Sequence, residues 1–349
     1  MRKKIFIWGK CDDNDRVLMI KEYLKKSEYI IVEDKSGNIF NNLYFSDIIY
    51  IPPMMHKIYK SLMCKILKKR VICDIYAPLY DTTVNDYKKY KKFNPIAILH
   101  FFRDYFAMTL SNPVLFLNES EATHFTNTIC LDKNKINYAI LPLYRSEKQQ
   151  AKLPYYKGKS SMLTLCWTGS FVPLQGVEKI IETAQLLKSY SIKFRLLIIG
   201  PNNKYKAYYQ KMVKDKNLND EVIFPNIWGD LNIWEELISN NCDISLGIFG
   251  DSQKAKNVVA NKVVDATAFG IPIITGYSNG LKEFFDCKKD IMCVDAVPLE
   301  ITKAIIKLSN MNIDEISSMV NRAYKVYTDT FNKENFIERI KKIIDETYK

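Results

Sequence analysis

Two charged side chains and a glycine-containing loop in the last third of the sequence could bind a phosphorylated sugar. Lys262 and Asp265 are three residues apart, so in a helix they lie on one face. The loop 276–280 follows a predicted strand and precedes a predicted helix, whose N-terminal N–H groups attract anions. An ammonium group and a helix end suit phosphates, whereas a carboxylate suits sugar hydroxyls. The segment 257–283 therefore predicts a nucleotide-sugar site.

A helix and a short strand must position these residues. The helical pattern that starts at Asn257 should end at Gly270, because Pro272 cannot continue a helix. The β-branched run 271–274 is short enough to be a buried parallel strand. The order of helix, turn, strand and helix is that of one repeat of a parallel α/β sheet.

The first half of the sequence alternates short apolar runs with helical patterns. Strands are predicted at residues 4–8, 29–32, 47–50, 71–75 and 114–117, and helices at 16–26 and 95–110. Such alternation is typical of a parallel sheet flanked by helices.

The second half repeats this organisation after the polar stretch 145–161, which is the predicted linker. Strands are predicted at residues 162–167, 194–199, 222–224 and 243–247, and helices at 176–189 and 333–348. The sequence thus predicts an α/β protein of two doubly wound, Rossmann-like domains facing a cleft, where ligands bind beyond the strand ends. The predicted boundaries are 1–150 and 151–332, with a closing C-terminal helix at 333–349 that could cross back to the first domain.

Positive charge is concentrated in one segment of the first half. The formal net charge is +12, and residues 54–70 contain six lysines and arginines. Apolar residues recur between them at helical spacing, namely Ile58, Leu62, Met63, Ile66 and Leu67. Two interpretations stay open: a helix with its apolar side on the core and its lysines in solvent, or a helix that rests on a membrane surface. No RNA-binding aromatic motif or zinc-finger spacing predicts a nucleic-acid partner.

The cysteines, histidines and apolar runs argue against a zinc protein, a disulfide-rich protein and a membrane-spanning protein. Eight cysteines without a Cys-x-x-Cys pair, and only three histidines, predict neither a zinc site nor a disulfide framework. No Asp-x-Asp follows a strand, so we expect no metal at the site. No apolar run approaches the ~20 residues of a spanning helix. The apolar run 5–8 predicts a first strand rather than a signal peptide, and a cytoplasmic location fits these features.

Two motifs carry a family resemblance. The segment 167–178, WTGSFVPLQGVE, resembles the loop that opens the donor domain of GT-B glycosyltransferases. The segment 254–272 resembles the donor-site motif of glycosyltransferase family 4, whose members retain the anomeric configuration. The similarity covers residues 160–345. In the first half, Tyr80-Asp81-Thr82 with Asp86 resembles members that build bacterial surface polysaccharides. The resemblance implies an acceptor-side first domain and a donor-binding second domain.

The resemblance also assigns roles to residues of the donor site. Asp265 would hold the ribose and Asn257 the transferred sugar, each replacing a glutamate of the family pattern, whereas Ser170 and Gln175 replace its arginine and lysine phosphate clamp. Lys262 would hold the diphosphate and offset the negative charge that develops on the leaving group. The remaining expected donor-binding residues are Gly169, Ser170, Gly200, Asn226, Ser278, Asn279 and Gly280. Backbone N–H groups of Gly169, Ser170, Asn279 and Gly280 are expected to be available as donors, and Lys254 and Lys256 could assist.

The acceptor side is expected in loops of the first domain. Candidate residues follow predicted strands: Gly9, Lys10, Asp81, Asp86 and His124, with Glu119 beside the last. Asp81 could be the catalytic base for an acceptor hydroxyl, although the leaving phosphate often takes that proton in retaining GT-B enzymes, and a turn-capping role is the structural alternative.

These expectations describe a metal-independent, retaining hexosyltransferase that moves a sugar from a nucleoside diphosphate, UDP by resemblance, to a saccharide or lipid-linked saccharide. The nucleotide sugar is a co-substrate, so no cofactor is expected. A basic helix at 54–70 would allow peripheral contact with an anionic membrane. Two alternatives stay open: a nucleotide-sugar epimerase or hydrolase of the same fold, and a non-catalytic basic membrane-binding module.

Overall fold

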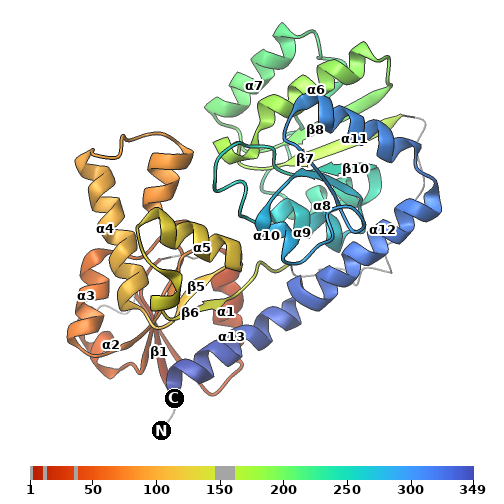
Figure 1. The fold of residues 1–349 in the computed structure, drawn as a ribbon. Helices are drawn as coiled ribbons and strands as arrows, with labels where there is room; N and C mark the ends of the chain where they lie inside the picture. Colours follow the sequence, from red (N-terminus) through yellow and green to blue (C-terminus); the bar gives the residue numbers. More distant parts are fainter. Residues whose placement is uncertain (1–2, 11–13, 35–37, 146–161) are drawn as a thin grey trace. The chain divides into compact units, whose positions relative to one another are not determined.

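The chain forms two compact units in a computed structural model that describes residues 3–10, 14–34, 38–145 and 162–349 (Figure 1). One unit comprises Met1–Tyr144 with Lys333–Lys349, and the other comprises Arg145–Asn332. The linker predicted at 145–161 lies outside the described residues except for Arg145. Each unit is a helix-flanked parallel sheet.

The sheet of the first unit has six parallel strands in the order β2-β1-β3-β4-β5-β6. The strands are β1 Lys4–Ile7, β2 Ile30–Glu33, β3 Ile48–Ile51, β4 Arg70–Asp74, β5 Val114–Phe116 and β6 Tyr138–Ile140. Side chains alternate between the two faces along each strand, so Phe6 and Ile49 pack on one face while Ile5 and Ile48 pack on the other. Both faces need a cover of helices, which explains the nearly continuous apolar runs.

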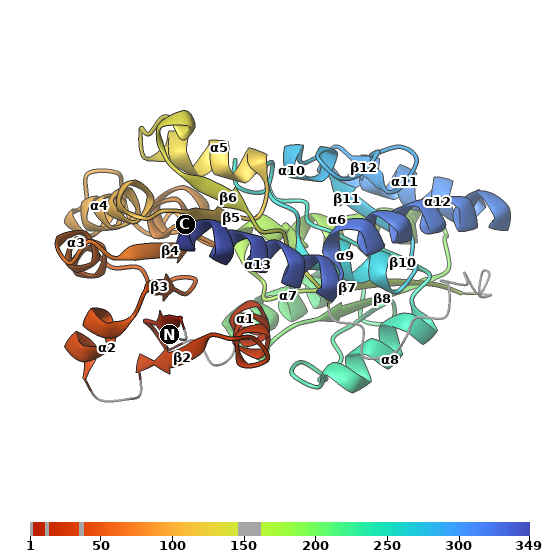
Figure 2. The same cartoon turned by 90° about the horizontal axis from the view of Figure 1, so that it is seen from below.

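Six α-helices cover this sheet: α1 Asp15–Lys25, α2 Ile39–Phe45, α3 Ile58–Ile66, α4 Pro95–Leu110, α5 Glu119–Thr128 and α13 Lys333–Tyr348. Helices α1 and α13 bury apolar side chains against one face, and α2 to α5 cover the other (Figure 2). The C-terminal helix therefore belongs to the core of the first unit, although residues 145–332 precede it.

A buried ion pair joins the elements of the first unit. Nε of Arg16, at the start of α1, lies 2.7 Å from Oδ2 of Asp74, at the end of β4. The same oxygen accepts the hydroxyl of Tyr50 at 3.1 Å, and Nη1 of Arg16 donates to the carbonyl of Pro142 at 2.9 Å. The guanidinium also lies 5.4 Å from the ring of Phe336 in α13. The carboxylate of Asp74 thus fixes Arg16, which belongs to α1 and contacts α13.

The sheet of the second unit has the order β12-β11-β10-β7-β8-β9, again with parallel neighbours. Its strands are β7 Leu163–Thr168, β8 Phe194–Ile199, β9 Val222–Ile223, β10 Ile244–Leu246, β11 Ile273–Gly276 and β12 Met292–Val294. Its helices are α6 Val177–Ser189, α7 Lys204–Asp215, α8 Leu231–Asn241, α9 Asn261–Ala268, α10 Asn279–Lys282, α11 Pro298–Asn310 and α12 Ile313–Val326. Helices α6, α7, α11 and α12 share one apolar core with the strands, and α9 contacts β10 and β11.

Several predicted elements are confirmed, and others differ in their bounds or type. The strand at 194–199 and the helices at 95–110 and 333–348 have the predicted bounds. The helix expected from Asn257 begins at Asn261, because residues 253–257 form turns. A short π-helix, Asp81–Asp86, follows β4, where the sequence predicts neither a helix nor a strand.

The structure of the basic segment 54–70 differs from the interpretation that its apolar residues face the core. It forms only the nine-residue helix α3, in which Lys60, Ser61 and Cys64 are buried. Leu62 and Ile66, which the core-facing interpretation placed inside, are exposed. That interpretation is therefore wrong for these residues.

Two further observations concern cysteines and membrane spans. Cys287 and Cys293 form a disulfide, a bridge that the sequence did not predict. Of the helices in the described ranges, none combines the length and apolar character that crossing a bilayer requires.

The Arg16–Asp74 pair yields a stability prediction. Asp74→Ala leaves a buried guanidinium without its counter-charge, so we expect a loss of about 3–5 kcal/mol in the free energy of unfolding. The double variant Arg16→Met/Asp74→Leu should lose less, because no charge stays buried. Urea unfolding measures both. Glu300→Ala removes the partner of Lys303 in an exposed pair and serves as the control, with an expected change below about 1 kcal/mol. A similar small loss for Asp74→Ala would contradict the assigned role.

Candidate functional site

Lys262 is a buried cation without a hydrogen-bond partner. It lies in the first turn of α9, is 6% exposed, and its Nζ has no partner among the residues that the structure describes. Nζ lies 4.4 Å from the centre of the Trp167 ring, at the end of β7. A positive charge at a helix N-terminus opposes the helix dipole, and burial removes its water. Both penalties disappear when an anion binds beside the ammonium group.

The burial of Lys262 also changes its protonation. Loss of water lowers the pKa of Lys262 from 10.5 to about 7, and the carboxylate of Asp265 opposes this shift only in part. Near neutral pH the group can therefore exchange its proton. A diphosphate beside it would hold it in the charged form.

The loops after β7 and β8 approach each other closely beside Trp167. Nε1 of Trp167 donates to the carbonyl of Gly247 at 3.1 Å, which fixes the ring. A Cβ on Gly200 would lie 2.5 Å from the carbonyl oxygen of Gly169, so neither loop could approach in this way with a larger residue at 200. Phe171 is buried with a φ of 62° and stacks on Trp167. A non-glycine residue in the left-handed region costs energy, and such strain is common at functional sites.

Two of the expected backbone donors are already occupied. The N–H of Gly169 donates to the carbonyl of Ile199 at 2.9 Å, and the N–H of Asn279 donates to the carbonyl of Lys256 at 2.8 Å. The expectation that both are available to a ligand is therefore wrong. The helix after the loop 276–280 is α10, which has only four residues. A helix this short contributes little dipole charge, so Lys262 is the main buried cation that the described part of the site offers to an anion.

Asp265 forms an ion pair that the sequence did not indicate. Its Oδ1 lies 2.8 Å from Nη1 of Arg145, whose Nη2 lies 2.6 Å from Oε1 of Glu235. Burial raises the pKa of Asp265, and the guanidinium of Arg145 opposes that shift. The backbone of Arg145 is also fixed, because its N–H donates to Phe331 and its carbonyl accepts the hydroxyl of Tyr327. The carboxylate of Asp265 is therefore oriented by an arginine whose side chain is fixed by Glu235 and whose backbone is fixed by Phe331 and Tyr327.

The other expected donor-site residues divide into paired and exposed groups. Oδ1 of Asn257 accepts a hydrogen bond from Nδ2 of Asn279 at 3.2 Å, so these two residues are in contact. The hydroxyl of Ser278 is buried and donates to the carbonyl of Val258 at 2.7 Å. Ser170 and Asn226 are exposed on the loops after β7 and β9.

In the first unit, two of the candidates lie together. Nε2 of His124, in α5, lies 3.2 Å from Oδ1 of Asp81, which also accepts Nδ2 of Asn85 at 2.9 Å. Asp81 is 1% exposed, whereas the side chain of His124 is 12% exposed, so the imidazole is the group nearer the surface.

The remaining acceptor-side candidates differ in exposure. Asp86 is buried, and Lys10 is exposed. Gly9 lies against the side chain of Met55. Within the described ranges, no group of three or more histidine, cysteine, aspartate or glutamate side chains could hold a metal ion.

Comparisons with known proteins identify a family over the second half of the chain. A family model described as glycosyl transferases group 1 matches residues 147–326. A search of curated protein sequences finds no significant match.

Solved structures resemble the whole chain at low sequence identity. They include sucrose-phosphate synthase from Thermosynechococcus elongatus, with a TM-score of 0.76, 11% identity and 99% of each chain covered. Anabaena HepE, in complex with UDP and glucose, has a TM-score of 0.70 and 10% identity over 99% of this chain and 100% of that one. A trehalose-6-phosphate structure from E. coli, bound with UDP-2-fluoro glucose, has a TM-score of 0.69 and 11% identity over 99% of each chain.

Two Rossmann-like domains with parallel sheets, matched over their whole length by such structures, define a GT-B fold. The family model spans more than half of the sequence. The chain belongs to the group 1 glycosyl transferases and is a glycosyltransferase.

Lys262 yields a prediction on stability and pH. The folded-state pKa is lowered to about 7 from 10.5, so the folded protein binds fewer protons than the unfolded chain between these values. This group therefore destabilises the fold increasingly as the pH falls from about 10.5 to about 7, and constantly below. Lys262→Met removes the cost of the buried ammonium group and should stabilise the protein by about 2 kcal/mol at neutral pH, but little at about pH 10. Urea unfolding at several pH values measures this difference.

The matched control is Lys303→Met, which replaces an exposed lysine of the same unit and should leave stability unchanged within about 0.5 kcal/mol. Equal stability of wild type and Lys262→Met at every pH would contradict a strained, buried ammonium group.

Proposed function

We propose that this glycosyltransferase is retaining and metal-independent, and moves a sugar from a UDP-sugar to a saccharide or lipid-linked saccharide in surface polysaccharide synthesis. The observation that carries the proposal is the buried, unpartnered Nζ of Lys262 beside Trp167. HepE is described in complex with UDP and glucose, and the E. coli structure is bound with UDP-2-fluoro glucose, which supports the choice of nucleotide.

Lys262 would stabilise the leaving nucleoside diphosphate. Negative charge grows on the bridging oxygen as the bond to the sugar breaks, and a desolvated ammonium group acts strongly on such charge. This role makes a divalent ion unnecessary at the diphosphate, because the cation is supplied by the chain.

Asp265 and Asn257 would hold the two ends of the donor. A carboxylate oxygen of Asp265 can accept a ribose hydroxyl while Arg145 holds the other side of the group. Asn257 offers an amide to the transferred sugar and already meets Asn279 there. A neutral amide at the sugar disfavours an epimerase, which needs acid and base groups around the ring.

The acceptor side would use Asp81 and His124. Because His124 is the more exposed of the pair, it would contact the acceptor hydroxyl and take its proton, while Asp81 holds the imidazole in place and stabilises the imidazolium that forms. The protein would work in the cytoplasm at the membrane that holds a lipid-linked acceptor, with the basic segment 54–70 beside the headgroups.

Donor turnover tests the proposal. Each of Lys262→Ala and Asp265→Ala should suppress the release of UDP from UDP-sugars by about 100-fold, because each removes a charged partner of the donor. Release is followed over a panel of nucleotide sugars in the presence of EDTA, and the anomeric configuration of the product is read by NMR. Lys303→Ala, an exposed lysine of α11, is the matched control and should retain full turnover.

Several outcomes would contradict it. Turnover unchanged by both substitutions would refute the donor site, and loss of wild-type turnover in EDTA would refute metal independence. An inverted product would refute retention. Free epimerised sugar nucleotide formed without an acceptor would favour the epimerase. No affinity for any nucleotide sugar would favour a non-catalytic module.

A second prediction concerns the acceptor side. Asp81→Asn keeps the size of the side chain but removes the charge next to His124, so kcat for transfer to saccharide acceptors should fall by about 10- to 100-fold. The dissociation constant of the donor should not change, because the pair lies in the other unit. A parallel loss in donor affinity, or an unchanged kcat, would leave Asp81 with a structural role only. The thermal midpoint of the variant checks its fold.

A further inference from the structure

Helix α3 is turned with its polar side inward. Its buried residues include Lys60, whose Nζ donates to the carbonyl of Trp8 at 2.6 Å. Burial lowers the pKa of Lys60 to about 8, so this inward position opposes the charge of the ammonium group. On the outer side, Tyr59, Leu62 and Ile66 follow one another at helical spacing, and Ile66 is 77% exposed. An ordinary surface helix has the opposite arrangement.

Helix α4 also has a polar group in the core and apolar side chains in solvent, although it buries Ala97, Ala107 and Met108 as well. Its buried side contains Asp104, whose Oδ1 lies 2.7 Å from Nε2 of the equally buried His56 and whose Oδ2 accepts the N–H of Tyr80. Its outer side carries Leu99 and Phe102, both exposed. Two neighbouring helices therefore place polar groups in the core and apolar side chains in solvent.

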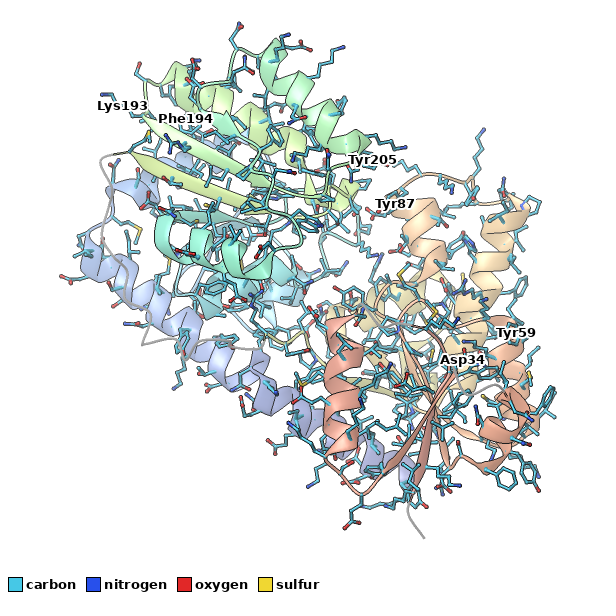
Figure 3. The ribbon with its side chains drawn as sticks, turned by 180° about the vertical axis from the view of Figure 1, so that it is seen from behind. Asp34, Tyr59, Tyr87, Lys193, Phe194 and Tyr205 are labelled. Atoms are coloured by element: carbon cyan, nitrogen blue, oxygen red, sulfur yellow. A yellow bond between two sulfur atoms is a disulfide. The ribbon has the colours of Figure 1, made fainter. Side chains whose placement is uncertain are left out.

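Helix α2 extends the same surface. Phe40 is 71% exposed, and Tyr44 follows it four residues later on the same side. Nζ of Lys69, just after α3, donates to the carbonyls of Tyr44 and Ser46, which ties α2 to α3. Helix α3 in turn packs against α4, and the three helices lie side by side in both views of the fold (Figures 1 and 2). Tyr59 marks this side of the unit (Figure 3).

We call this surface the apolar face and define it by Phe40, Tyr44, Leu62, Ile66, Leu99 and Phe102. It is larger than the scattered single hydrophobic residues of an ordinary surface, and such patches mark interaction sites. Its exposed side chains come from three helices whose other sides are fixed in one core.

The charge around the apolar face has one sign. The segments 38–46, 54–70 and 87–103, which supply the face and its borders, contain no aspartate or glutamate. They contain six basic residues in 54–70 and five in 87–103, counting lysine and arginine. Lys88, Lys89, Lys91 and Lys92 are exposed beside Phe93, which is itself 90% exposed.

We propose that the apolar face docks on the surface of an anionic lipid bilayer, with its apolar side chains in the acyl boundary and its lysines at the headgroups. Apolar and aromatic side chains rimmed by lysine suit that interface. A second copy of the chain would bring two faces of the same charge together, which repel. A nucleic acid would match the lysines but not the exposed leucine and isoleucine side chains.

This inference rests on the proposed function in one respect, because a lipid-linked acceptor would lie in the same membrane. Docking itself requires no turnover. The two can therefore fail separately.

Co-sedimentation with vesicles tests the inference on the full chain. Vesicles of phosphatidylcholine alone are compared with vesicles that also contain phosphatidylglycerol, over a range of salt. Wild type should bind the anionic vesicles and lose binding as salt rises. Ile66→Gln/Leu99→Gln/Phe102→Gln should weaken binding about 10-fold or more. Lys91→Gln/Lys92→Gln should weaken it about 10-fold or more, because each lysine near the surface contributes about a fivefold change.

Matched controls come from exposed positions of the second unit. Tyr190→Gln/Leu299→Gln/Ile313→Gln removes the same number of exposed apolar side chains, and Lys211→Gln/Lys214→Gln removes two exposed lysines. Both should bind vesicles like wild type. Lys262→Ala should also bind like wild type, which separates docking from donor turnover. Thermal midpoints confirm that each variant is folded.

The inference is overturned by equal binding to both kinds of vesicle, or by control variants that lose as much binding as the face variants. Dimerisation of wild type in light scattering that the triple face variant abolishes would assign the face to a second copy instead. Binding to duplex DNA or RNA that is as tight as vesicle binding, and lost in the same variants, would assign it to nucleic acid.

Discussion

Parallel strands must be covered on both faces, and this constraint organises both units of the protein. The backbone N–H and C=O groups of neighbouring strands form hydrogen bonds with each other, and the side chains that alternate between the two faces are mostly apolar. Polar groups are consequently moved to the ends of the strands, where loops lead into helices. In the second unit Trp167, Gly169 and Gly200 lie at such ends, and the first turn of α9 follows the loop after β10. The candidate donor site therefore lies at the carboxyl ends of the strands, where the chain leaves the sheet.

At that edge the protein holds an unfavourable charge. Lys262 is buried, lies at a helix N-terminus and contacts a ring rather than a carboxylate. Asp265, one turn further along α9, is bound instead by Arg145. The arginine thus occupies the carboxylate that would otherwise pair with the lysine. This separation leaves Nζ of Lys262 without a hydrogen-bond partner among the described residues, and in the proposed donor site an anion bound beside it would offset the burial penalty.

The first unit uses buried polar groups in a different way. Asp74 with Arg16, and Asp104 with His56, fix helices against the sheet through charges inside the core. Because α3 and α4 direct Lys60 and Asp104 inward, some of their apolar side chains, such as Ile66 and Leu99, lie outside. The buried His56–Asp104 pair and the exposed apolar face are therefore both consequences of how these two helices are oriented. The same unit carries Asp81 and His124, the candidates for the acceptor side.

The two parallel α/β sheets, most helices and the placement of Lys262 and Asp265 on one face of a helix could be predicted from the sequence, because they depend on local periodicity. The family resemblance could be predicted because it depends on two short motifs. It could not reveal that Arg145 pairs with Asp265, since 120 positions separate them. Nor could it show that the N–H groups of Gly169 and Asn279 are already bonded within the fold. Only the tertiary structure decided which side of α3 and α4 faces the core. A helical pattern defines two sides, but which of them is buried depends on the elements that pack against it.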